Sequence, residues 1–195
     1  MSEGTAPKLM VVVTSTRANR RGPAIADWFV GRANQHGGFS VEPVDLLALG
    51  LPLLDEPNHP RLRQYERAHT KAWSAKVDAA DGFVFVVAEY HYGMPPALLN
   101  ALDFLAQEWA YKPAAFVSYG GVSGGTRSVQ MAKSVLTSLK VMPIPEAVAL
   151  PFFTNFFGAD ATFHPGEVHE KAATAMLDEL LRWTRALKTL RPPNA

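Results

Sequence analysis

Short apolar runs alternate with longer amphipathic stretches along this chain, and this alternation limits the fold more than any other feature of the sequence. Valine-rich runs of roughly four to eight residues are typical of strands buried on both faces. Strands that alternate with helices pair in parallel, because each parallel neighbour needs a crossover connection. We therefore expect an α/β fold in which all 195 residues form one domain, a parallel sheet covered by helices on both faces.

Prolines inside two of the expected strands set the order of the sheet. The five expected strands are Leu9–Val13, Phe39–Leu46, Phe83–Ala88, Ala114–Ser118 and Val141–Leu150. Proline cannot donate a backbone hydrogen bond, so the second strand, with Pro43, and the fifth, with Pro143 and Pro145, belong at the sheet edges. The order 2-1-3-4-5 places both outside, which predicts a doubly wound, flavodoxin-like five-stranded parallel sheet.

Amphipathic stretches are expected to form the helices. They begin near Pro23, span Arg61–Ala79, begin at Pro95 or Pro96, follow Thr126, and span Glu167–Leu190. In the predicted strand order, ligands bind at the carboxyl ends of the strands, where the order reverses between the first and third. The loops after strands one, three and four should therefore form the site.

The composition restricts the chemistry of that site. The chain has no cysteine, which excludes disulfides, iron–sulfur clusters and thiolate zinc. Its 19 basic residues nearly balance 18 acidic ones, so nothing indicates a nucleic-acid or membrane partner. The polar segment Met1–Lys8 precedes an apolar run too short for a secretion signal or a membrane span, so we expect a cytoplasmic protein. Any redox chemistry must reside in a bound cofactor.

The first loop, Thr14–Gly22, carries hydroxyl, amide and guanidinium groups just before an expected helix N-terminus. Such a terminus has unpaired N–H groups and a partial positive charge, so these side chains make a phosphate-sized anion site. The candidate ligands are Ser15, Thr16, Arg17, Arg20, Gly22 and Pro23. A solvated basic loop in which Ser and Thr cap the helix is the alternative. The absence of a Gly-rich Walker pattern argues against a nucleoside triphosphate.

The second loop, Glu89–Met94, and the third loop, Ser118–Thr126, offer a surface for a flat ring. Aromatic faces and backbone N–H groups suit isoalloxazine, and glycine permits close approach of the backbone. The candidate contacts are Glu89, Tyr90, His91, Tyr92 and Gly93, and Ser118, Tyr119, Gly120, Gly121 and Gly124. The alternatives are aromatics that pack between loop and helix, which is the better interpretation for His91 alone, and a third loop that is only a flexible turn. Three suitable loops converging on one crevice favour the ligand.

At these three loops the chain resembles the NADPH-dependent FMN reductase family, flavodoxin-like enzymes that include quinone, azo-dye and chromate reductases. The motifs that carry the resemblance are Thr14-Ser15-Thr16-Arg17, the segment Glu89–Asp103, and Ser118-Tyr119-Gly120-Gly121. The resemblance covers the chain to about Leu150. It implies a homodimer or homotetramer whose Ser15, Arg17 and amides near Gly22 hold the FMN phosphate, with Glu89–Gly93 and Tyr119–Gly121 bordering the ring. Where the family usually has Pro-Glu-Tyr-Asn, this chain has Ala-Glu-Tyr-His.

The expected function is transfer of a hydride from NADPH or NADH to bound FMN and then of electrons to a quinone, free flavin or similar small acceptor. The flavin performs this chemistry, so no catalytic residue is named. A non-enzymatic FMN carrier serving a protein partner is the main alternative, and a colourless sugar-phosphate or nucleotide enzyme is another.

Two further features stand outside the three loops. His164 and His169 lack a third ligand in a clear pattern, so we expect no metal and instead a cap on the last helix. The aromatic cluster Phe152, Phe153, Phe156 and Phe157 could cover the core, line a substrate pocket or meet a second subunit, and the subunit contact is favoured.

Overall fold

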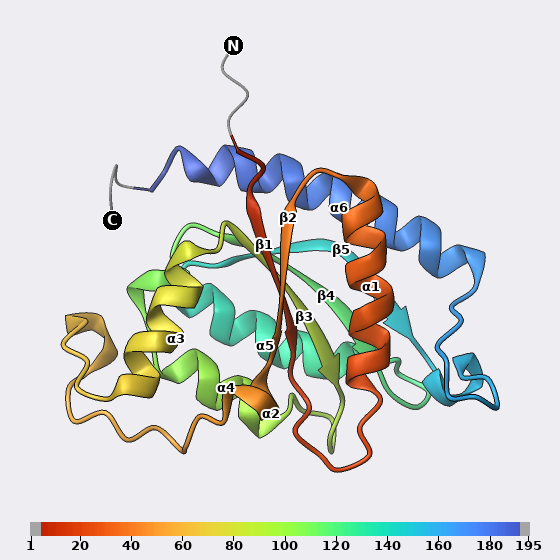
Figure 1. Ribbon diagram of the computed structural model, residues 1–195, viewed down its shortest axis with the longest axis horizontal. Coiled ribbons are helices and arrows are strands. Elements are labelled where there is room, and N and C mark those ends of the chain that lie inside the picture. The colour runs from red at the N-terminus through yellow and green to blue at the C-terminus, as the bar shows by residue number, and fades with distance from the viewer. Residues whose placement is uncertain (1–4, 192–195) are drawn as a thin grey trace.

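The protein contains the five-stranded parallel sheet that the sequence predicts. A computed structural model describes residues 5–191 and shows the strand order β2-β1-β3-β4-β5 (Figure 1). The strands are β1 (Lys8–Val13), β2 (Ser40–Asp45), β3 (Gly82–Ala88), β4 (Pro113–Tyr119) and β5 (Met142–Leu150). Both proline-bearing strands lie at the edges, which confirms the predicted order. The register between β4 and β5 shifts between Ala114 and Phe116, opposite Pro143 and Pro145, because neither proline can donate to the ladder.

Helices cover both faces of the sheet and enclose two apolar cores. One face packs against α1 (Gly22–His36) and α6 (Glu167–Lys188), and the other against α3 (Ala68–Ala79), α4 (Pro96–Asp103) and α5 (Thr126–Ser138) (Figure 1). Side chains of β1 and β3 alternate between the two cores, so both strands are apolar along their length. In residues 5–191 no helix is both long and apolar enough to cross a membrane.

The segment between β2 and α3 differs from the sequence prediction. A short helix, α2 (Leu46–Leu49), follows β2 directly and is capped by Asp45, whose carboxylate accepts from the Leu47 N–H. The expected helix over Arg61–Ala79 is instead a 3₁₀ turn, η1 (Pro60–Leu62), an extended stretch and then α3. Arg63 ends η1 in the left-handed region, at φ 51°, which stops helix propagation.

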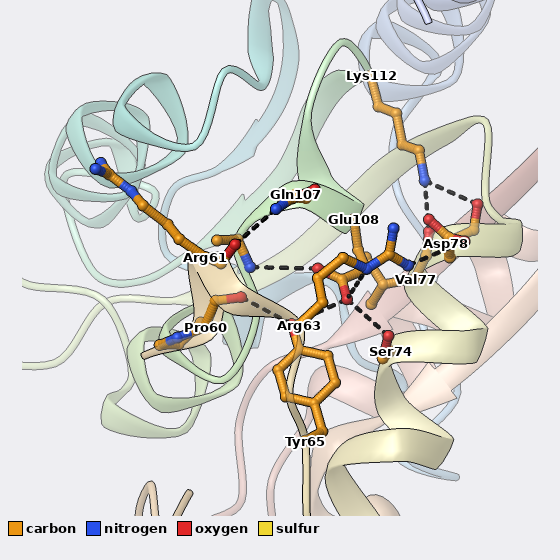
Figure 2. A network of polar contacts seen from close by, with 11 residues as sticks. Pro60, Arg61, Arg63, Tyr65, Ser74, Val77, Asp78, Gln107, Glu108 and Lys112 are labelled. Carbon is orange, nitrogen blue, oxygen red and sulfur yellow. Dashed lines mark hydrogen bonds and ion pairs between the residues drawn. The ribbon is translucent and has the colours of Figure 1, made fainter. Parts of the chain in front are cut away.

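A buried carboxylate fixes this long segment to the body of the domain. Glu108, in the 3₁₀ turn η2 (Gln107–Trp109), has a fully buried side chain and accepts hydrogen bonds from Tyr65 Oη at 2.9 Å and Ser74 Oγ at 2.7 Å (Figure 2). Arg63 Nε lies 3.3 Å from the same carboxylate. Burial, and then Glu108, raise the pKa of Tyr65, so its hydroxyl stays a donor. The network joins the segment before α3, α3 itself and η2.

Lys112 extends the network to the C-terminus of α3. Its ammonium donates to the carbonyl oxygens of Val77 at 2.7 Å and Asp78 at 2.9 Å (Figure 2). The Val77 carbonyl also accepts from the N–H of the C-cap residue Ala80, and the lysine adds a charged donor to the last carbonyls of the helix. Burial lowers the pKa of Lys112 to about 8.

The aromatic segment after β5 covers the core rather than standing free of it. Phe153 and Phe156, in the 3₁₀ turn η3 (Phe153–Phe156), and Phe157 pack against the α1/α6 core, whereas Phe152 is 55% exposed. The core-covering alternative therefore holds for three members of the cluster, and Phe152 is the most exposed member.

Replacement of Glu108 should destabilise the fold. We expect Glu108→Ala to lower the free energy of unfolding by about 2–4 kcal/mol, because it leaves a cavity, takes the acceptor from the buried Ser74 hydroxyl, and leaves the Tyr65 hydroxyl only its 3.3 Å bond to the Pro60 carbonyl. Urea-induced unfolding measures the change. Glu167→Ala, which removes an exposed partner of Lys171, is the control and should cost less than about 1 kcal/mol. Equal losses in the two variants would contradict a structural role for the buried network.

Candidate functional site

The three loops selected from the sequence meet at one edge of the sheet. They follow β1, β3 and β4, whose carboxyl ends lie side by side because the strands are parallel (Figure 1). Ser15 Oγ lies 2.5 Å from Tyr90 Oη, which joins the first loop to the second. The Glu89 N–H donates to the Tyr119 carbonyl at 3.2 Å, which joins the second loop to the start of the third. The predicted convergence of these loops is therefore present.

Only one guanidinium of the first loop is uncommitted in the part of the chain that the structure describes. Arg20 forms an ion pair with Asp45 at the end of β2, and the Arg21 guanidinium lies 4.9 Å from the centre of the Phe157 ring. Arg17 is exposed and, within residues 5–191, forms no ion pair. Arg17 is thus the basic side chain that an anion could engage without breaking an existing contact.

The N-terminus of α1 keeps its backbone donors free of side-chain caps. Arg21 occupies the N-cap position without a side-chain hydrogen bond, and Pro23 stands in the first turn. Thr14 Oγ1 donates instead to the Val86 carbonyl at 2.9 Å, so it is not the cap that the alternative interpretation required. The first turn of α1 therefore offers N–H groups to a ligand.

A buried hydroxyl without a partner lies against this helix terminus. Tyr119 Oη is buried and makes no hydrogen bond, and a Cβ atom on Gly22 would fall 2.9 Å from it, so any side chain there would have to displace the tyrosine. Burial, and then the neighbouring Tyr90, raise the pKa of Tyr119 to about 12, so the hydroxyl keeps its proton. Uncapped amides, an unpaired guanidinium and an unsatisfied hydroxyl are the donors that a phosphate monoester needs.

The second loop ends in a tight turn with two strained residues. Tyr90 and Gly93 exchange both backbone hydrogen bonds, at 3.0 and 2.9 Å. His91 and Tyr92 between them have φ values of 49° and 67°, in the left-handed region where Asn-Gly is usual. Each such residue costs about 1–3 kcal/mol. His91 is exposed, so the expectation that it packs between loop and helix is wrong.

Glu89 ties the second loop to the third and to α5. Its side chain is 6% exposed and accepts from Ser123 Oγ at 2.8 Å and from Arg127 Nε at 2.7 Å. Burial alone would raise the pKa of Glu89, but the hydrogen bonds from Arg127 and Ser123 outweigh it and hold the pKa below its usual value. The guanidinium of Arg127 in turn lies 3.8 Å from the centre of the Tyr92 ring.

Two glycines of the third loop are required by the close packing of the backbone around them. Gly124 and Gly125 have φ values of 59° and 83°, and a Cβ on either would approach backbone atoms at 2.9 and 2.8 Å. A Cβ on Gly121 would meet nothing within 4 Å, so the space beside it is open. Ser118 is buried within β4. A flat ring could therefore approach the backbone at Gly121, whereas Gly124 and Gly125 are closely packed.

Sequence reasoning missed two partners of the site. Asp45 holds Arg20, and Arg127 in the first turn of α5 holds Glu89 and Tyr92. The position of Arg127 directly after the glycine-rich run was a signal that could have drawn attention to it. Thr16, which the sequence assigned to the phosphate site, lines a cavity of about 370 Å³ between α2 and α4.

A larger cavity of about 1350 Å³ lies at the opposite, amino-terminal edge of the sheet. It is lined by residues of the Glu108 network together with Lys112 and Arg191, and none of the three loops contributes to it. Its size alone therefore does not mark it as the site.

Within the described residues, no group of three or more His, Asp or Glu side chains could hold a metal ion. His164 Nε2 lies 2.5 Å from Thr162 Oγ1, and the N-terminus of α6 has no side-chain cap. The expectation that this histidine pair caps the last helix is therefore wrong.

Comparison with known proteins gives a consistent result. The family model described as NADPH-dependent FMN reductase matches residues 7–155. An NAD(P)H-dependent FMN reductase of Schizosaccharomyces pombe is 43% identical over 149 residues, 74% of each chain. A probable NADPH:quinone oxidoreductase of Oryza sativa is 42% identical over 146 residues, 72% of this chain and 73% of its own. The solved structure of the flavoenzyme NAD(P)H:(acceptor) oxidoreductase of Paracoccus denitrificans superposes with a TM-score of 0.72 at 19% identity, covering 92% of this chain and 98% of that one.

The ion pair of Glu89 makes stability depend on pH. Because the folded-state pKa of Glu89 lies below its unfolded value of 4.5, the pair contributes stability above that pH and loses it as the pH falls through the folded pKa. We expect Glu89→Gln to cost about 1.5–3 kcal/mol near neutral pH and progressively less in acid, as measured by urea unfolding across pH. A constant difference between the two proteins from neutral to acidic pH would contradict this assignment.

Proposed function

The chain belongs to the NADPH-dependent FMN reductase family, and from this premise we propose that Ser15, Arg17 and the first-turn amides of α1 hold the phosphate of FMN. The main support for the proposal is a set of hydrogen-bond donors without partners at the N-terminus of α1. Arg17 and the Tyr119 hydroxyl have no partner among residues 5–191, and Gly22 keeps the space between Tyr119 and the helix clear of a side chain.

As a member of this family the protein is an NAD(P)H-dependent flavoprotein oxidoreductase. Bound FMN would supply the redox chemistry, which is transfer of a hydride from the nicotinamide and then of electrons to a quinone, free flavin or similar small acceptor. The chain's own residues bind and orient. Tyr90, fixed by Ser15, and the backbone around Gly121 would border the ring.

The carboxylate nearest to this crevice is already engaged. Glu89 is ion-paired with Arg127 and its pKa is lowered, so it holds no proton to give at neutral pH. We therefore assign no general acid or base to the protein, in keeping with chemistry that the flavin itself performs.

We propose that the protein forms a homodimer or homotetramer. Leu47 is 50% exposed and Leu53 is 84% exposed, and both line the apolar cavity beside Thr16 and α4. Large apolar side chains gathered at one surface hollow usually meet a partner. A cytoplasmic location fits an enzyme that consumes NAD(P)H.

Arg17→Ala should weaken FMN binding by about ten- to a hundredfold, because a hydrogen bond to a charged group contributes about 1.5–3 kcal/mol. Titration of the apoprotein with FMN, followed by flavin fluorescence, measures the dissociation constant. Arg21→Ala is the matched control: it removes the same charge from the same loop, but its guanidinium lies on Phe157, so the constant should change less than about threefold. Equal effects would show that only net charge matters, and no effect of Arg17→Ala would remove it from the site.

An absorption spectrum and an NADPH oxidation assay distinguish a flavin reductase from the two alternative functions. We expect the purified protein to be yellow, to lose its flavin bands on addition of NADPH, and to oxidise NADPH steadily when a quinone is present. A non-enzymatic carrier would show the bands without turnover with small acceptors, and a sugar-phosphate or nucleotide enzyme would be colourless.

Sedimentation tests the subunit contact. At micromolar concentration the wild type should sediment as a dimer or tetramer, and Leu53→Glu should shift it toward the monomer because a charge would be buried at the contact. A wild-type monomer at that concentration would overturn the oligomer proposal.

A further inference from the structure

Tyr92 presents its ring to solvent at the rim of the crevice. The residue is 69% exposed and stands at φ 67° in the turn that closes the second loop. A tyrosine in the left-handed region is rare, since glycine or asparagine fills such positions without strain. The sequence thus keeps a large aromatic side chain where packing does not require it and the backbone disfavours it.

Two neighbouring side chains hold this ring in one place. The Arg127 guanidinium lies 3.8 Å from the ring centre and covers one face. Glu89, at the base of the same loop, fixes Arg127 through an ion pair and through hydrogen bonds to its Nε and its backbone N–H. The three side chains form a chain of contacts in which Arg127 links Glu89 to Tyr92.

We propose that Tyr92 is the contact on which a planar electron acceptor stacks, and that Arg127 and Glu89 are its positioning residues. The inference rests on the proposed function, which places the flavin ring beside this loop. With one face of Tyr92 covered by the guanidinium, the remaining exposure leaves ring surface for a partner. Quinones are flat and electron-poor, so they stack favourably on an electron-rich phenol ring.

The backbone strain at Tyr92 makes the test selective. Tyr92→Gly removes the ring and at the same time relieves the disfavoured φ, so the variant should fold with an unchanged or raised melting temperature. We expect the dissociation constant of menadione for the oxidised holoenzyme, measured by calorimetry without NADPH, to rise about three- to tenfold, as loss of one aromatic contact predicts. Tyr92→Phe keeps the ring and should bind menadione like the wild type.

Tyr111→Gly is the matched control. Tyr111 is also a tyrosine in the left-handed region, at φ 59°, with the Lys140 ammonium 5.3 Å from its ring centre, but it lies at the opposite edge of the sheet. Its replacement changes the same chemistry away from the crevice, so menadione affinity should stay at the wild-type value.

The role of Glu89 is tested by combining substitutions. If Glu89 acts through Tyr92, Glu89→Gln should weaken menadione binding in the wild-type background and cause no further loss in the Tyr92→Gly background. A residue that only stabilised the fold would cause the same loss in both backgrounds, and that result would overturn its positioning role.

Three results would overturn the assignment of Tyr92. They are unchanged menadione affinity in Tyr92→Gly, an equal loss in Tyr111→Gly, and a loss in Tyr92→Gly that accompanies dissociation of the oligomer on sedimentation. All variants are compared at full flavin occupancy, judged from the absorption spectrum. A wild-type protein that binds no FMN would refute the proposed function before any variant is compared, so the two failures are distinguishable.

Discussion

The adjacency of β1 and β3 is the constraint on which the rest of the structure depends. Both strands are buried on both faces, and the chain leaves β1 toward α1 on one face and leaves β3 toward α4 on the other. The two connections therefore diverge at the carboxyl ends of the strands, which is where ligands bind in sheets of this order. Because the core fixes the strands, every loop that rises from this edge has a rigid base, and its side chains can be held in position by a few contacts.

Those contacts are polar and link loops that are distant in the sequence. Ser15 meets Tyr90, and Glu89 meets Ser123 and Arg127, so each loop is tied to the next. Each ion pair also withdraws a charge from the crevice. What remains at the helix terminus is a small set of donors in residues 5–191 without partners, which is the basis of the proposal that an anion binds there.

The sequence predicts those features that depend on local pattern. Continuous apolar runs identify β1 and β3, and Pro43 and Pro145 place their strands at the edges, because a missing N–H has the same consequence in any context. The loops of the site follow from that order. The pairing of Arg20 with Asp45, or of Glu89 with Arg127, depends on which loops come together in space, and charge composition alone cannot specify it. Likewise the helix expected from Arg61 is broken by Arg63 in a left-handed conformation, which the network around Glu108 supports.

The second and third loops both contain residues with positive φ, but they place different residue types there. Both loops need left-handed backbone to turn sharply at the strand ends. The third loop meets the demand with Gly124 and Gly125, where any Cβ would collide with backbone atoms, so its sequence is dictated by packing. The second loop meets it with His91 and Tyr92, although a Cβ-free residue would relieve the strain at either position. A side chain retained against the preference of its own backbone is better explained by what it contacts than by the stability of the fold.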